Sequence, residues 1–171
     1  MFDAETGAYK RHWGAYGNRP DDSAPRTRVF EGQGSPQFNL VHGLAVSNDG
    51  IVYVGDRVNN RIQAFQLDGT FINEVYIQRE TTAREGTGFD VAFSADEDQQ
   101  YFFVPDGSNK KVQIVDRQKM QLVGFFGGYG GHGPGEFYHI HSISTDSSGT
   151  VYLGEVNNGR RVLRWRHSGS D

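Results

Sequence analysis

Cysteine is absent from the 171-residue chain, which excludes disulfide bonds and metal sites built on thiolates. The absence does not identify a compartment, because proteins without disulfides occur on both sides of membranes. No apolar run approaches the about 18 residues that a membrane-spanning helix needs, and the first residues, MFDAETGAYKRHWG, lack the apolar core of a signal peptide. The sequence therefore predicts no membrane partner and leaves the localisation open.

Long runs of like charge are also absent, and the net charge is only −4. This pattern disfavours a nucleic-acid surface or an anionic membrane surface. An alternative, RNA binding, rests on a few clustered basic residues: Arg160, Arg161, Arg164 and Arg166, with Lys110 and Lys111. No stacking aromatic residues alternate with them, so nucleic acid is not the favoured partner. The sequence also lacks the G-x-S-x-G and H-E-x-x-H motifs of common hydrolases.

Glycine and aromatic residues are abundant instead, with 23 glycines and 13% aromatic residues. Such a composition favours short strands and tight turns over helices. The length suits one domain with a core of its own. We therefore predict a single all-β domain.

An internal repeat organises this domain, as three segments align as copies: 38–76, 86–126 and 137–169. Asp56, Asp106 and Glu155 occupy one column of the alignment, 50 and 49 residues apart. Ile62, Val112 and Val162 occupy another, 50 residues apart each time. This regularity predicts three structural units of the same kind.

Each copy has the pattern of four antiparallel strands, the unit of a β-propeller blade. In the first copy, turn residues separate strands expected over 43–47, 51–55, 61–65 and 71–76. The second strands are apolar on both faces, as expected for strands packed between neighbouring blades. We expect Phe65, Val115 and Trp165, at the ends of the third strands, to fill the wedges between blades.

The motifs H-G-L-A-V, D-G-I-V-Y-V-G-D-R and N-N-R-I-Q-A-F resemble the NHL repeat, and the likeness extends over nearly the whole chain. The resemblance implies a β-propeller, usually of six blades. The predicted segments are an orphan fourth strand at 8–13, a long loop at 14–37, blades at 38–82 and 83–136, and an incomplete blade at 137–167.

Three blades cannot close into a ring, since propellers need about four to eight. The third copy stops at the turn before its fourth strand, whereas residues 8–13 resemble a fourth strand without its blade. We therefore expect a homodimer in which residues 8–13 of each chain complete blade 137–167 of the other, giving a six-bladed ring. The alternative is that the chain is half of a larger propeller.

Candidate ligand-binding residues stand at the start of the first strands, which line the channel of a propeller. His42 and His141 share one column, and Phe89 takes this position in the middle copy. Neutral imidazole is the commonest transition-metal ligand, so one interpretation of the pair is a metal site, with zinc as the first choice. In the interpretation that we favour, histidine is merely the residue preferred at this position and is hydrogen-bonded to backbone.

The chain also resembles the peptidyl-hydroxyglycine amidating lyase group, whose zinc histidines lie in H-S-L and H-G-L motifs. The resemblance implies zinc at His42 and His141, and it implies that Arg57 holds a substrate carboxylate through a bidentate pair. The sequence departs from this pattern at Phe89 in the histidine column, and at Gly107 and Val156 in the column of Arg57.

The carboxylates that end the second strands have two interpretations as well. They can fix the Asn-rich turns or pair with the basic residues that open the third strands: Arg61, Lys111 and Arg161. A calcium site would need more oxygen ligands than the pattern supplies.

Two functions remain as hypotheses. The first is a module that binds a small molecule, a peptide or a protein at the mouth of the channel. The second is a metal-dependent lyase or hydrolase that uses His42, His141 and Arg57.

Overall fold

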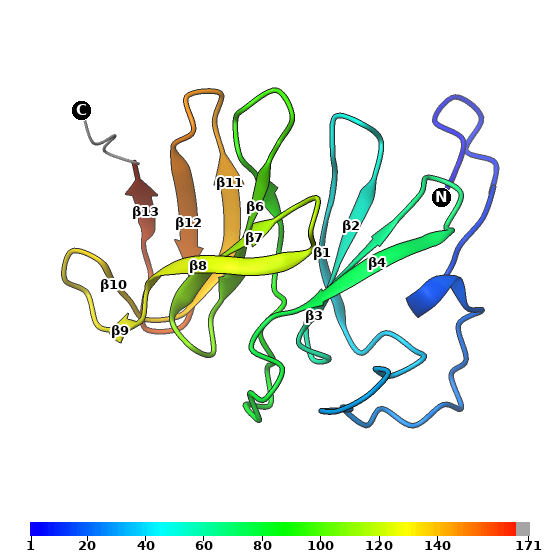
Figure 1. Cartoon of the computed structure of the whole chain (residues 1–171), viewed down its shortest axis with the longest axis horizontal. Helices are drawn as coiled ribbons and strands as arrows, with labels where there is room; N and C mark the ends of the chain where they lie inside the picture. Colours follow the sequence, from blue (N-terminus) through cyan, green and yellow to red (C-terminus); the bar gives the residue numbers. More distant parts are fainter. Residues whose placement is uncertain (167–171) are drawn as a thin grey trace.

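The protein is described by a computed structural model over residues 1–166, and it forms three antiparallel sheets that follow one another in a row (Figure 1). The first blade contains β1 (Val41–Val46), β2 (Val52–Asp56), β3 (Arg61–Phe65) and β4 (Phe71–Tyr76). The second contains β5 (Ala92–Phe93), β6 (Tyr101–Asp106), β7 (Lys111–Asp116) and β8 (Gln121–Gly127). The third contains β11 (Ile140–Thr145), β12 (Val151–Glu155) and β13 (Val162–Trp165).

Every blade is a meander in which each strand pairs with the next along the chain. The prediction of an all-β propeller fold is thereby confirmed. Minor elements are a short 3₁₀ turn, η1 (Ala15–Gly17), and a parallel pair of β9 (Tyr129–Gly130) and β10 (Glu136–Phe137). In residues 1–166 no helix has the length and apolar character to cross a membrane. The turn predicted at 167–169, and with it the last residue of the third predicted blade, lies outside the described residues.

Turns between second and third strands repeat one backbone conformation. Asn60, Lys110 and Arg160, each one residue before the basic residue that opens the third strand, have φ values of 56°, 58° and 48°. Asparagine enters this left-handed region more readily than other residues with side chains. The turn therefore requires a left-handed residue at this position, and only the first blade supplies it with asparagine.

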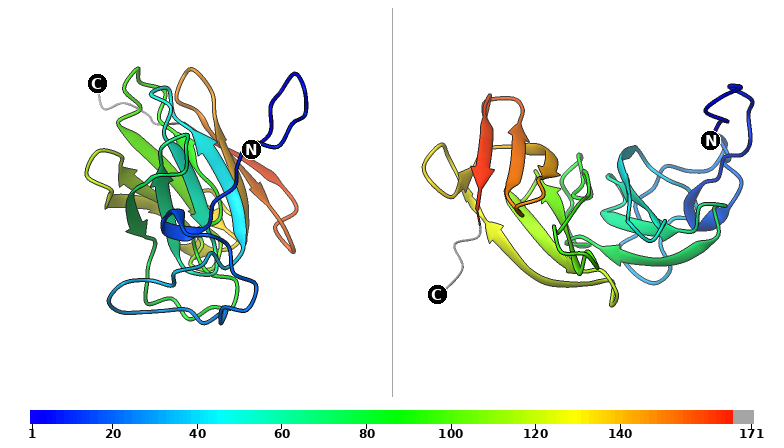
Figure 2. Two further views of the ribbon diagram at one scale, coloured as in Figure 1. Left: turned by 90° about the vertical axis from the view of Figure 1, so that its right-hand side faces the viewer. Right: turned by 90° about the horizontal axis from the view of Figure 1, so that it is seen from above.

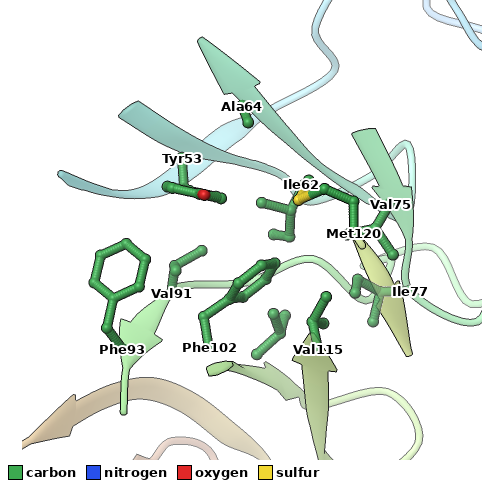
Figure 3. Packing of buried hydrophobic residues seen from close by; sticks show 11 residues of the cluster. Tyr53, Ile62, Ala64, Val75, Ile77, Val91, Phe93, Phe102, Val115 and Met120 are labelled. Carbon is green, nitrogen blue, oxygen red and sulfur yellow. The ribbon is translucent and has the colours of Figure 1, made fainter. Parts of the chain in front are cut away.

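The first core lies between the first and second blades, where apolar side chains of the two sheets face each other (Figure 3). Tyr53 and Ile62 of the first blade meet Val91, Phe102 and their neighbours in the second. Tyr53 and Phe102 have ring centroids 5.2 Å apart. Because β2 and β6 also bury much of their opposite faces, Val52–Val54 and Tyr101–Val104 are apolar on both sides, and each strand then ends in a buried aspartate.

A second core joins the second and third blades through Val112, Ile143, Leu153 and further side chains. Trp165 packs on this cluster, and its ring stacks on Phe126 at 4.8 Å. Val115 lies in the first core, so both residues occupy wedges between blades. Phe65 does not, because it faces the outer side of the first blade.

That outer side is covered by residues of the chain itself. Trp13, Phe38 and Phe71 pack around Phe65, Val52 and Val54. Residues 1–13 form a small hairpin, held by a bridge between Phe2 and Tyr9, that projects beyond the first blade (Figures 1 and 2). The strand predicted at 8–13 does not form here: Tyr9 makes a single bridge, and residues 8–11 make backbone-to-backbone hydrogen bonds only with residues 1–3. The pairing of residues 8–13 with another chain stays a prediction.

The repeated carboxylates fix the turns, although their partners differ. Asp56 forms a fully buried pair with Arg61 at 2.8 Å, and Glu155 pairs with Arg161 at 2.6 Å. Asp106 forms no ion pair with Lys111 and accepts hydrogen bonds from Asn109 and Gln113 instead. Burial raises the pKa of Asp106 to about 6, because these donors offset only part of the desolvation.

Replacing Phe102 by alanine tests the core between blades. The side chain is fully buried, so F102A should lower the free energy of unfolding by about 3–5 kcal/mol. Exposed Phe125 on β8 provides the control, and F125A should change the free energy of unfolding by about 0.5 kcal/mol or less. Denaturant unfolding measures both, and equal effects would contradict the assigned core.

Asp106 predicts a pH dependence of stability. Because its folded pKa of about 6 exceeds the ordinary value of 3.8, its contribution to folding is complete below pH 3.8 and is lost as pH rises through 6. The difference corresponds to about 3 kcal/mol. Unfolding at a series of pH values should show this loss in the wild type and a flatter profile in D106N.

The exposed Asp98 provides the matched control for this experiment. D98N should keep the slope of the wild type. A slope that is the same in D106N and in the wild type would contradict the role of Asp106.

Candidate functional site

The starts of the three first strands converge around one buried aromatic ring. Phe89 is fully buried, and the rings of His42 and His141 each lie 5.5 Å from it. The guanidinium of Arg57 lies over the same ring at 4.2 Å. Phe89, which interrupts the histidine column, therefore packs against all three predicted site residues: His42, His141 and Arg57.

His42 and His141 are brought into direct contact although 99 residues separate them. Their Nε2 atoms lie 3.2 Å apart, and Nδ1 of His42 lies 2.8 Å from the carbonyl oxygen of Phe89. A proton on that Nδ1 makes this hydrogen bond and leaves a lone pair on Nε2 of His42. Burial, with His42 and Arg57 nearby, lowers the pKa of His141, which favours its neutral form.

The geometry of the pair suits two ligands of one metal ion. Nitrogen ligands at 2.0–2.1 Å in a tetrahedral zinc site lie about 3.3 Å apart, close to the observed 3.2 Å. A ligating histidine also commonly donates its second N–H to a backbone carbonyl. Residues 1–166 nevertheless contain no group of three or more His, Cys, Asp or Glu side chains that could hold a metal ion, whether zinc or calcium.

Arg57 reaches the site but is held by Glu85. Its Nε donates to the Glu85 carbonyl and its Nη2 to Oε2 of the same residue, both at 2.8 Å. The stack on Phe89 fixes the plane of the guanidinium. Arg57 is thus preorganised, and an added carboxylate would have to bind its remaining Nη1 edge or displace Glu85.

Sequence reasoning missed Glu85, and it located His139 near the rim of the channel without assigning it a role. Nε2 of His139 is buried 3.2 Å from Oε2 of Glu85, yet the geometry does not make a hydrogen bond. Glu85 lies in the connection between two copies, where no alignment column exists. His139 precedes the histidine column by two residues, and only its contact with Phe89, 5.7 Å between rings, reveals its place.

Two glycines explain how the strands come so close. A Cβ on Gly43 would lie 2.3 Å from Oδ1 of Asp90, whose Oδ2 accepts a hydrogen bond from Ile143 N–H at 3.3 Å. A Cβ on Gly107 would lie 2.5 Å from the carbonyl oxygen of Ile140. The second blade therefore has no room for a residue like Arg57 in this column.

A cleft of about 830 Å³ lies beside the site. The loop at 14–37 forms one wall, and Arg57 and Val41, the neighbour of His42, belong to the other. Arg26 and Arg84 also line it, together with the acidic residues Asp21, Asp22 and Glu85. Its volume is within the range of small-molecule sites.

Comparisons with known proteins agree with this architecture. Residues 38–65 match the NHL repeat model, which covers β1 to β3 of the first blade. Among solved structures, a chain of hydrazine synthase from Kuenenia stuttgartiensis is similar, with a TM-score of 0.52 and 15% identity over 66% of this chain. The match spans 28% of that chain, and at this identity it concerns the fold alone.

In all, 236 chains of solved structures match this chain, and a fold by itself assigns no activity. The chain is therefore a β-propeller of repeated blades in which one segment, residues 38–65, matches the NHL repeat.

Proposed function

We propose that the chain is a propeller module that binds a peptide-like ligand bearing a carboxylate at the mouth of the channel. The cleft of about 830 Å³ between the loop at 14–37 and Arg57 is the observation that carries this proposal. It contains charges of both signs, which suits a ligand that combines an anionic group with hydrogen-bond donors.

Arg57 is the residue that would hold the carboxylate. Its guanidinium is fixed by Glu85 and Phe89 before a ligand arrives, so little conformational entropy is lost on binding. The side chains of Arg26 and Arg84 form no hydrogen bond with any residue in 1–166, so both can turn toward an anion. His42 and His141 would contact a part of the ligand that extends toward the channel.

A metal-dependent lyase or hydrolase is the second candidate function. The separation of 3.2 Å between the Nε2 atoms of His42 and His141 favours it. Bound zinc would supply Lewis-acid activation of a carbonyl or of a water molecule. The two histidines would hold it and Arg57 would orient the substrate, but a catalytic zinc site has three protein ligands and residues 1–166 offer two. Binding is therefore the leading proposal.

Calorimetric titration tests the binding proposal with a short peptide ending in a free glycine carboxylate and with its C-terminal amide. We expect the free peptide to bind the wild type, and R57A to weaken binding about tenfold or more, because a charge-assisted hydrogen bond is lost. The amide should bind weakly to both proteins. K119A removes an exposed cation in the turn after β7 and should bind as the wild type does. Equal affinities for peptide and amide would contradict the proposal.

Zinc analysis of protein purified without chelator tests the second candidate. If zinc is held by the pair, the metal content should fall in H42A and in H141A and stay unchanged in H12A, which alters an exposed histidine. Melting temperature with and without added zinc gives a second readout. Absence of zinc in the wild type, with no thermal shift on addition, would rule this candidate out.

A further inference from the structure

At each end of the row of blades lies an exposed apolar side chain whose counterparts in the alignment are buried: Leu44 in the first blade and Val162 in the third. We define the first-blade end face by Leu44 and Val46 of β1, and the third-blade end face by Val162 and Arg164 of β13. Isolated exposed apolar residues are ordinary on a protein surface, but these occupy defined columns of the alignment. The columns make it possible to infer what each face contacts.

The column of Val162 identifies the third-blade end face as half of a blade contact. Ile62 and Val112 are fully buried, each against the next blade in the chain. Val162 follows them in the same column, yet its exposed fraction is 77%. A third blade that contacted a following blade in the same manner would bury it.

The column of Leu44 identifies the first-blade end face as the other half. Val91 and Ile143, two residues after the histidine column like Leu44, are 5% and 9% exposed and pack against the preceding blade. Leu44 is 63% exposed. Ile62 meets Val91 in the first core and Val112 meets Ile143 in the second, so the matching partner for Val162 is a residue in the position of Leu44.

We infer that a second copy of this chain covers both faces, with Val162 of each copy against Leu44 of the other. The two copies are related by two-fold symmetry, so the same contact occurs twice and closes a ring. Two copies of three blades give six, within the about four to eight of known propellers. The blades already form a curved row (Figure 2), and the histidines of the first and third blades are in contact across the second.

The terminal hairpin suits the same arrangement. It projects beyond the first blade (Figure 2), while β13 has an unpaired edge among the described residues. Exposed strand edges tend to pair with other chains. In the ring, residues 8–13 of one copy pair with β13 of the other, and each pair of copies brings four column histidines to the channel.

Sedimentation of the chain and two charged variants tests this inference without any ligand, so it is independent of the proposed function. The wild type should sediment at twice its 19.1 kDa mass. L44K and V162E should each lose the association, because each of the two contacts in the ring then buries one unpaired charge. An equimolar mixture of L44K and V162E should regain the double mass. In a mixed pair, one contact keeps the wild-type leucine and valine, and in the other the introduced lysine faces the introduced glutamate.

V123E is the matched control, because Val123 is an exposed valine on β8 away from both faces, at 53% exposure. It should keep the mass of the wild type. A wild type with the mass of one chain would overturn the inference. So would association that survives both L44K and V162E, or a mixture of the two that stays at the mass of one chain.

Discussion

Apolar contact between successive blades is the interaction on which the structure depends. A four-stranded sheet with two apolar faces cannot bury both by itself, so each blade requires a neighbour on either side. Tyr53 and Ile62 face the second blade, while Val52 and Val54 of the same sheet face away from it. The second blade alone has a neighbouring blade on both sides. The first covers its outer face partly with Trp13 and Phe38, and the third leaves Val162 exposed.

The candidate site follows from this packing. Because the blades meet at an angle, their first strands converge, and Phe89 of the middle blade becomes the support for residues from both neighbours. The glycines at 43 and 107 permit the approach, and Asp90 ties the second blade to the third. The same convergence brings two imidazoles into contact and leaves Arg57 at the edge of a cleft. Site geometry and blade packing are thus consequences of one arrangement.

Much of the fold could be predicted from spacing alone, because a blade needs the same residue types at the same positions. The intervals of 50 residues and the Asn-rich turns located the strands. The histidine column also placed His42 and His141 at one end of the channel. Alignment could not show that they touch, because this depends on the angle between blades, nor that Phe89 supports them.

Features outside the repeat could not be predicted from the sequence, because no periodicity constrains them. Glu85 lies in a connection without counterparts, and the cleft depends on the path of the loop at 14–37, which no periodicity fixes. Lys111 has the charge to pair with Asp106 but its ammonium lies over the ring of Phe125 at 4.1 Å, so the carboxylate is left with neutral donors. Phe65 was expected in a wedge between blades and instead faces Trp13.

Small-angle X-ray scattering of the wild-type chain tests most directly whether blades require neighbours on both faces. The account predicts a forward scattering intensity that corresponds to two chains and a distance distribution of a closed, disc-like ring. Scattering from a single open arc of three blades, unchanged on raising the protein concentration, would contradict it.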